Sequence, residues 1–437
     1  MFRSNLRLAL YWLHFFALLA IAPNTGAVPR IAPRKKPTPD VWIPNLLRHW
    51  IDSLGPVASN PSKYELQIIF TRIHRDAAGL PHLEPHFYRI KKGYYFYPAS
   101  LVKLPVSILA LSRLEEYQIP GLNWNTTVYS DSAAPCQQRI HSDSTAENRL
   151  PSIGHYIKRM MLVSDNFSYS RVFEFLGRDD LRKELQRVGL PDVRIVHRFD
   201  GNCSFAQNGL LNPMTFIGNS GDTLLRLPLR FSTSFPRHPL GRIRKGRGQQ
   251  LPNGRTVKRP KDFTDANYLS LKDADGILKR LILPEAFSPM QRFRLSNESR
   301  NFLISYMGRW PRESTFPHYH DTIYEDSHKK YLVYADVHGR IDSDSVRIFN
   351  VVGLSFGYMS DCAYIINVAA GIEFFLSASV YVNADGIIND GRYEYQQIGF
   401  PFFARLGRMF YGLERERYKA LKPDLQGWMN LVKESAY

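Results

Sequence analysis

The sequence predicts an α/β fold in which an antiparallel sheet is flanked by terminal helices and interrupted by a large helical insertion. Two runs near the N-terminus, residues 64–74 and 87–97, are typical of strands. Three more strands are predicted near the C-terminus, at residues 346–352, 363–368 and 372–382. Between them, residues 100–306 are mostly helix-like segments separated by polar loops. Strands from both ends of the chain therefore have to meet in one sheet.

Helical patterns at residues 42–54 and 400–418 border these strands. We therefore predict a sheet domain made of residues 42–104 and 330–437. Residues 105–329 form a mostly helical domain. The hydrophobic content of 44% and the aromatic content of 13% are those of a folded protein and exclude a disordered one.

The N-terminus has the pattern of an export signal. Arg3 and Arg7 precede an apolar stretch, residues 8–22, and small residues follow at 25–27. We predict a signal peptide at residues 1–27, a Pro-rich basic linker at 28–41, and a periplasmic or extracellular protein; a signal-anchored form is the alternative. Export permits disulfides, but Cys136, Cys203 and Cys362 allow at most one, with three possible pairings, and buried thiols are an equal alternative.

The formal net charge of +17 is unevenly spread along the chain. Glycine and proline residues in the segment 236–261 predict a flexible basic loop, and no acidic residue lies between Asp222 and Asp262. For an exported protein, an anionic envelope polymer or lipid head groups fit this loop better than nucleic acid, which we do not expect as a partner. A solvated loop without a ligand is the alternative. The segment contains nine basic residues: Arg237, Arg242, Arg244, Lys245, Arg247, Arg255, Lys258, Arg259 and Lys261.

Ser100 and Lys103 begin a long apolar run after a β-like aromatic segment. Residues three apart share a helix face, so the Lys103 amine can lie against the Ser100 hydroxyl. Apolar flanks favour a neutral lysine, which can take the serine proton, and free N–H groups at a helix start suit a tetrahedral oxyanion. The same spacing at Ser327 and Lys330 lies in a polar stretch with no strand or buried helix, and we attribute it to chance.

A second polar motif, Ser164-Asp165-Asn166, occurs once, at a break between two helical segments. A serine there can relay a proton, and an asparagine amide can bind a substrate carbonyl. A helix cap is the alternative interpretation of the tripeptide.

Taken in order, these motifs resemble the penicillin-recognising serine enzymes, most closely the class A β-lactamase group, over most of the chain from residue 42 to 418. The third matching segment is residues 347–353, on a strand near the C-terminus. The resemblance implies a β-lactamase/transpeptidase-like fold with the site between the two domains. It implies that Ser100 is the acylated nucleophile, that Lys103 assists its deprotonation and that Ser164 passes a proton to the leaving nitrogen.

The resemblance also implies the substrate contacts. Asn166 is expected to hold the amide of the acyl side chain, and the N–H groups of Ser100 and Leu354, just beyond Gly353, to form the oxyanion hole. The family's third motif, Lys-Thr/Ser-Gly, is absent; its place is taken by residues 351–353, Val-Val-Gly. Loss of a charge-assisted hydrogen bond weakens anion binding by roughly 1.5–3 kcal/mol. Arg347, four residues earlier on the same strand face, is the candidate to substitute, and an exposed strand-end charge is the alternative.

The second departure concerns deacylation. The family uses a glutamate within Glu-x-x-Leu-Asn to activate water, whereas the nearest match here begins with Asn208, and an amide is not a general base. Asp200 is the nearest acid but fits no motif. We therefore expect a long-lived acyl-enzyme on a β-lactam or a peptidoglycan-like amide or ester.

We expect no cofactor and no metal. His318, His320 and Asp321 are interpreted as a polar loop, because no further ligand group is evident. Two other functions stay open: a catalytically reduced module that binds the cell envelope, and an esterase or peptidase for a neutral substrate. The motif losses favour the binding module, whereas retention of a paired nucleophile and base favours an enzyme.

Overall fold

The computed structural model describes residues 41–91, 93–341 and 346–433. The signal peptide predicted for residues 1–27, and the predicted linker up to residue 40, lie outside the described residues. Within the described ranges, no helix is both long and apolar enough to span a bilayer.

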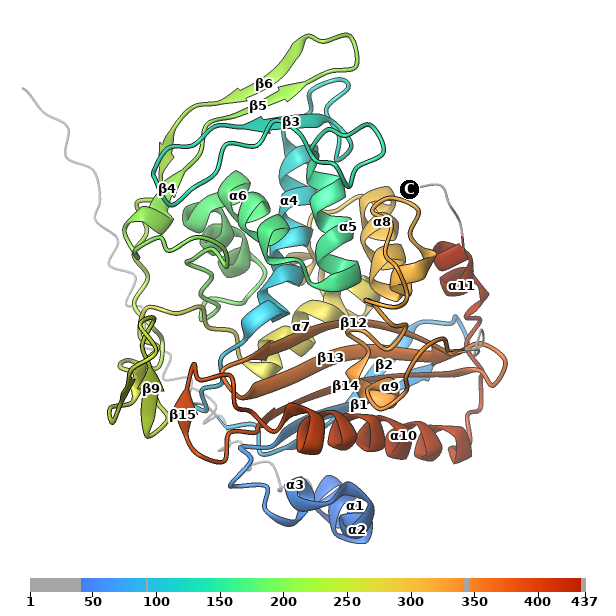
Figure 1. Ribbon diagram of the computed structural model, residues 1–437. Coiled ribbons are helices and arrows are strands. Elements are labelled where there is room, and N and C mark those ends of the chain that lie inside the picture. The colour runs from blue at the N-terminus through green and yellow to red at the C-terminus, as the bar shows by residue number, and fades with distance from the viewer. Residues whose placement is uncertain (1–40, 92, 342–345, 434–437) are drawn as a thin grey trace, which may run out of the picture. The chain divides into compact units, whose positions relative to one another are not determined.

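The centre of the fold is a five-stranded antiparallel sheet with the order β12-β13-β14-β1-β2 (Figure 1). Strand β1 pairs with β14, with Gln67 opposite Ser379, so strands from the two ends of the chain lie side by side. This confirms the predicted α/β fold class. The strands are β1 (Gln67–Arg75), β2 (Pro81–Tyr88), β12 (Val346–Ser355), β13 (Tyr358–Asn367) and β14 (Ile372–Tyr381).

Both faces of the sheet are covered by helices, which explains its nearly continuous apolar strands. Along β1, Ile68 and Phe70 pack in one core with helix α10, residues Phe400–Glu416, whereas Ile69 and Ile73 belong to the core on the other face. The first side is covered by α1 (Trp42–His49), α2 (Ile51–Leu54), α3 (Pro56–Ser59), α9 (Tyr331–Tyr334) and α10 (Phe400–Glu416).

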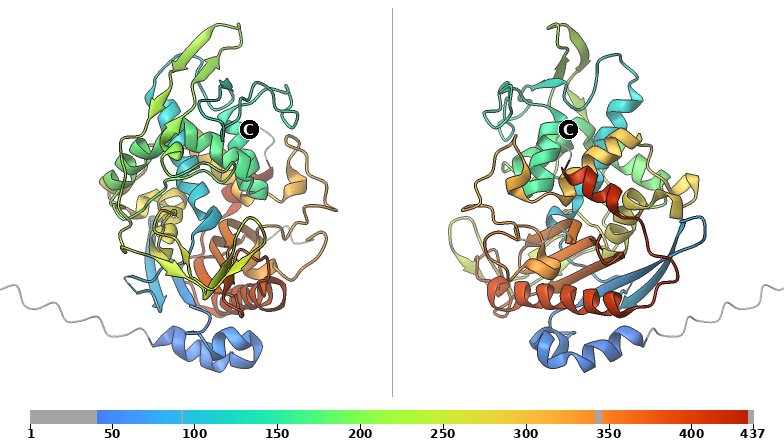
Figure 2. Two further views of the ribbon diagram at one scale, coloured as in Figure 1. Left: turned by 60° about the vertical axis from the view of Figure 1, so that its left-hand side comes forward. Right: turned by 90° about the vertical axis from the view of Figure 1, so that its right-hand side faces the viewer.

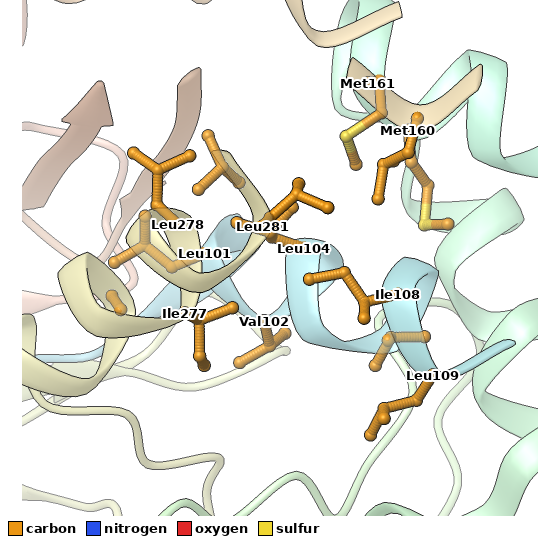
Figure 3. Close-up of a cluster of buried hydrophobic side chains, with 14 of the residues drawn as sticks. Leu101, Val102, Leu104, Ile108, Leu109, Met160, Met161, Ile277, Leu278 and Leu281 are labelled. Carbon is orange, nitrogen blue, oxygen red and sulfur yellow. The ribbon is translucent and has the colours of Figure 1, made fainter. Parts of the chain in front are cut away.

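The helical insertion covers the opposite face (Figure 2). Helix α4 lies at its centre, and a cluster around Leu104, Ile108, Met160 and Leu278 joins it to α5 and α7 (Figure 3). A helix surrounded by others has no polar face, and the apolar run after Ser100 has this character. The helices of the insertion are α4 (Lys103–Glu116), α5 (Ile153–Val163), α6 (Asn166–Arg187), α7 (Leu271–Ile282) and α8 (Asn297–Gly308), and α11 (Gln426–Lys433), near the C-terminus, packs against α8 on this side.

The second predicted strand, residues 87–97, is wrong. Strand β2 lies earlier, at Pro81–Tyr88, and residues 94–97 have no regular structure. Strand β2 is at the sheet edge, where prolines such as Pro85 are tolerated. The aromatic run misled the prediction because its rings are buried for another reason: Tyr95 and Tyr97 pack against Phe263 in the helical part.

The helical region also contains short strands that the sequence did not indicate. The basic loop 236–261 is folded into small hairpins: β8 pairs with β11, and β9 lies between β10 and β15. A two- or three-residue strand carries too little pattern to be predicted. The short strands are β3 (Thr127–Ser130), β4 (Leu210–Leu211), β5 (Met214–Ile217), β6 (Thr223–Leu227), β7 (Arg230–Phe231), β8 (Arg244–Lys245), β9 (Gly248–Gln250), β10 (Thr256–Val257), β11 (Lys261–Asp262) and β15 (Ile387–Ile388).

Candidate active site

Ser100 lies in a tight turn at the start of the central helix. Residues Ala99–Val102 form a single 3₁₀ turn, and α4 begins directly after it at Lys103. Ala99 has a left-handed backbone with φ of 45°, an uncommon conformation for a residue with a side chain. Strain of this kind persists where the surroundings enforce it, and it often marks functional sites. The turn leaves Ser100 half-buried while its neighbours Leu101 and Val102 are buried.

Lys103 brings the two predicted polar motifs together. Its Nζ lies 2.8 Å from Ser100 Oγ, 3.0 Å from Ser164 Oγ and 2.8 Å from Asn166 Oδ1. It also donates to the backbone carbonyl of Ser164. The side chain is only 1% exposed, and the ring of Phe199 lies beside the amine. The spacing of Ser100 and Lys103 therefore produces the predicted contact.

Burial favours the neutral form of Lys103. Desolvation holds its pKa well below the ordinary value, the positive charge of Lys329 lowers it further, and Asp165 opposes both. A neutral amine has two N–H donors and one lone pair. The Ser164 carbonyl and Asn166 Oδ1 only accept, so they can take the two donors and leave the lone pair for the Ser100 hydroxyl proton. The direction of the pKa shift agrees with the expectation that the lysine is neutral, and its role as a base stays a prediction.

Ser164, Asp165 and Asn166 form the turn between α5 and α6. Ser164 ends α5 with a left-handed backbone, φ 61°, and Asp165 caps α6 by accepting from the Ser168 N–H at 2.7 Å. The motif is thus a helix cap and a polar cluster at once, because Asp165 caps while its two neighbours contact Lys103. Asn166 is exposed, so its amide is open to a ligand.

Gly353 on β12 lies against the Ser100 turn. A Cβ added there would lie 2.5 Å from the carbonyl oxygen of Pro98 and 2.6 Å from Ser360 Oγ, so only glycine fits. This approach places the following residue, Leu354, beside the turn that carries Ser100. The arrangement is compatible with the predicted oxyanion hole, whose role stays a prediction.

Arg347 is buried rather than exposed at a strand end. Its guanidinium is 1% exposed and makes a two-pronged ion pair with Glu313, at 2.8 and 2.9 Å. The alternative of an exposed charge is therefore wrong. A substrate contact by Arg347 stays a prediction, and this ion pair is unfavourable to it because the charge is already neutralised.

The segment around Asp200 packs against the start of α6 through a buried ionic network. Glu174 is fully buried and accepts from Arg198 at 2.6 Å and from Arg171 at 3.0 Å. Arg171 also donates to one oxygen of Asp200 at 3.3 Å. The other oxygen, Oδ1, is buried and has no hydrogen-bond partner among the described residues. Asn208 is held within this segment, accepting from the Arg198 N–H at 2.8 Å.

A cavity of about 330 Å³ lies beside these segments. It is lined by Tyr97, three residues before Ser100, by Asp200, and by Phe356, three residues after Gly353. A volume at the small end of ligand-binding pockets suits a small molecule. Cys203 on its wall forms a disulfide with Cys136, which selects one of the three pairings left open by the sequence, and Cys362 is a buried free thiol.

Sequence reasoning missed a group of buried polar residues next to the site. Lys329 and Lys330, assigned to a polar stretch, are only 4% and 2% exposed. The Lys330 amine donates to the carbonyls of Met307 and Ile348 and to Asn350 Oδ1, whereas its backbone N–H donates to the Ser327 carbonyl at 2.8 Å. Asn350 could have indicated this group, because a polar residue inside an apolar strand requires a buried hydrogen-bond partner.

The metal interpretation gains no support in the described part of the chain. No group of three His, Cys, Asp or Glu side chains capable of holding a metal is present there. The rings of His318 and His320 pack edge to face at 4.8 Å.

Comparison with solved structures finds β-lactamases. That of Sphaerobacter thermophilus is 11% identical, with 85% of this chain and 99% of that chain covered and a TM-score of 0.46. That of Burkholderia phymatum is 14% identical, covering 85% and 99%, with a TM-score of 0.45. A class A enzyme from Mycobacterium abscessus is 16% identical, covering 85% and 98%, with a TM-score of 0.41. No curated protein sequence matches the chain.

The fold is that of the β-lactamase-like serine hydrolases: an antiparallel sheet from both chain ends and an inserted helical part. The family model described as the beta-lactamase enzyme family matches residues 83–367, which is more than half of the chain. That range includes Ser100, Lys103, Ser164, Asn166 and Gly353. The chain therefore belongs to the beta-lactamase enzyme family.

Proposed function

We propose that this protein is an exported serine hydrolase or acyltransferase that acts on β-lactams or related amides and esters through an acyl-enzyme on Ser100. The contact between the buried Lys103 amine and Ser100 Oγ, at 2.8 Å, is the observation that carries the proposal. A binding module has no need of a desolvated base against a half-buried hydroxyl. The cavity next to this turn provides space for a small acyl group.

The chemistry divides between two proton transfers. Lys103 takes the Ser100 proton as Oγ attacks the carbonyl carbon, and the N–H groups of Ser100 and Leu354 bind the oxyanion. The carbon–nitrogen bond then breaks, and Ser164 gives its proton to the leaving nitrogen. Because Ser164 Oγ is 3.0 Å from Lys103 Nζ, the proton that Lys103 took can replace the one that Ser164 gave.

We further propose that deacylation is slow. Asn208, where the family carries its glutamate, is an amide, and it is held by the Arg198 N–H and the Cys203 carbonyl. Asp200 is the remaining acid at the cavity, and an arginine already binds one of its oxygens. An Asp200→Asn variant that leaves the adduct lifetime unchanged supports slow, unassisted hydrolysis. A much longer lifetime in this variant would mean that Asp200 activates the water.

The test is intact-mass spectrometry of the protein with a fluorescent penicillin, beside a Ser100→Ala control. A lasting adduct that the control lacks supports both acylation and slow deacylation. Rapid hydrolysis with no adduct would contradict slow deacylation. An adduct of equal size on the control would place the chemistry elsewhere.

A neutral-substrate esterase or peptidase is the second candidate, because the site lacks the family's third-motif lysine and Arg347 is paired with Glu313. Matched neutral and anionic chromogenic esters separate the two: preference for the neutral ester favours this candidate. For location, we propose export with or without a retained anchor. Mass analysis of the mature N-terminus and fractionation of cells distinguish the two forms.

A further inference from the structure

Lys329 contacts the last turn of α5, the helix that ends next to Ser164, and Lys103 contacts Ser164 itself. The Nζ of Lys329 donates to the carbonyl of Met161 and approaches that of Met160 at 3.4 Å, in the last turn of α5. The last carbonyls of a helix lack partners within the helix, and a cation there also suits the helix dipole. Lys329 thus stabilises the helix end that presents Ser164.

The chain holds Lys329 in this position against a conformational cost. Its backbone is left-handed, with φ of 65°, and its carbonyl accepts from Asn350 Nδ2 on β12. The side chain is almost fully buried, so the amine has lost its hydration. Ala99, Ser164 and Lys329 all have such a backbone, and all three adjoin the site.

The charges around the two lysines define the electrostatics of the site. The positive charge of Lys329 lowers the pKa of Lys103, and the negative charge of Asp165 raises it. Asp361, the buried acid near Lys329, has its pKa raised by burial to about 7, so it is only partly charged near neutrality. His328 is held neutral, its pKa lowered to about 4 by burial and by Lys329. Lys330 lies next along the chain, and burial holds its pKa well below the ordinary value.

We propose that Lys329 is a positioning residue for the reaction: it fixes the Ser164 turn and places a positive charge near Lys103, which keeps Lys103 a neutral base. The inference rests on the proposed function of Ser100 and Lys103. It assigns a role to a residue that belongs to none of the three sequence motifs.

The sign of the effect follows from the order of the titrations. Burial lowers the pKa of Lys329 to about 7, so Lys329 carries its charge on the acid side of neutrality. Below pH 7, the positive charge of Lys329 opposes protonation of Lys103. Lys103 therefore stays deprotonated, and able to act as a base, at a lower pH than it would without Lys329. Removing the charge must therefore raise the pKa of Lys103 and move the acid limb of the reaction to higher pH.

The experiment follows the rate of adduct formation with a fluorescent penicillin between pH 4 and 9. Lys329→Gln should move the acid limb upward by roughly one pH unit. Asp165→Asn, which retains an oxygen that can cap α6, should move it downward. Lys330→Gln is the matched control: it removes an equally buried amine with three oxygen acceptors, and should lower stability without moving the limb.

The outcomes separate the inference from the proposed function. If the wild-type protein forms no adduct at Ser100, the proposed function fails. If it does and Lys329→Gln has the wild-type pH profile, the inference fails. A readout without substrate is the NMR titration of ¹³C-labelled lysines in the unmodified protein. The Lys103 signal should respond again near pH 7, where Lys329 loses its charge; a single-step Lys103 titration would overturn the inference even if the variant does not fold.

Discussion

Replacing Gly353 with alanine tests whether the close approach of β12 to the Ser100 turn organises the site. The added Cβ would lie 2.5 Å from the Pro98 carbonyl oxygen and 2.6 Å from Ser360 Oγ, distances that real Cβ atoms do not show. The obstacle at Pro98 is backbone, so relief requires β12 and the turn to move apart. Overpacking of this kind costs about 1–3 kcal/mol. The movement should also separate Ser100 from the Leu354 N–H and lower the acylation rate.

Gly412→Ala is the matched control, because no atom outside its own helix lies within 4 Å of the added Cβ. Within helix α10, this change should stabilise the protein by about 0.5–1 kcal/mol. Urea unfolding measures both stabilities, and the rate of penicillin adduct formation reports the site. If Gly353→Ala keeps wild-type stability and a wild-type rate, β12 does not position the oxyanion hole as argued.

Three further predictions concern other parts of the molecule. Glu174→Gln removes the carboxylate that two buried arginines share, leaving Arg171 only its longer contact with Asp200, and should destabilise the protein by about 3–5 kcal/mol in urea unfolding; a loss below 1 kcal/mol would contradict a buried network. Burial lowers the pKa of His197 from 6.5 to about 4. Between these two pH values the unfolded chain therefore carries a proton on His197 that the folded protein does not. Stability should therefore fall as the pH drops from 6.5 to 4, by up to about 1.4 kcal/mol per unit from this group, and His197→Gln should remove that part of the slope. Replacing the exposed Arg255, Lys258 and Arg259 with serine should weaken binding to an anionic polymer such as polyphosphate without changing stability. Unchanged binding would mean that this segment is a solvated surface without a ligand.

Four strands of the sheet, β1, β12, β13 and β14, were predictable because they are long, apolar and buried on both faces. The contact of Ser100 with Lys103 was predictable because it is local, three residues apart on one turn. The strand predicted at residues 87–97 failed because aromatic residues favour strands and buried loops alike, and Tyr95 and Tyr97 belong to a buried loop.

The burial of Lys329 could not be predicted from the sequence. Its burial depends on β12 and α5, which are distant in sequence, and its surroundings are polar. Similarly, the ion pair of Arg347 with Glu313 joins a strand to a short 3₁₀ helix, and no local sequence pattern predicts it. Asn350 and Asp361, polar residues inside apolar strands, were local signs that polar partners had to lie in the core.

The central claim is that a neutral Lys103 activates Ser100, and the rate of acylation with and without that amine tests it most directly. The measurement is the rate of adduct formation at Ser100 for the wild-type protein and for Lys103→Met, which fills the same buried space. A positioned base contributes about 10²–10⁴-fold, so the variant should fold and react slower by that factor. A folded Lys103→Met protein that acylates at the wild-type rate would contradict the account.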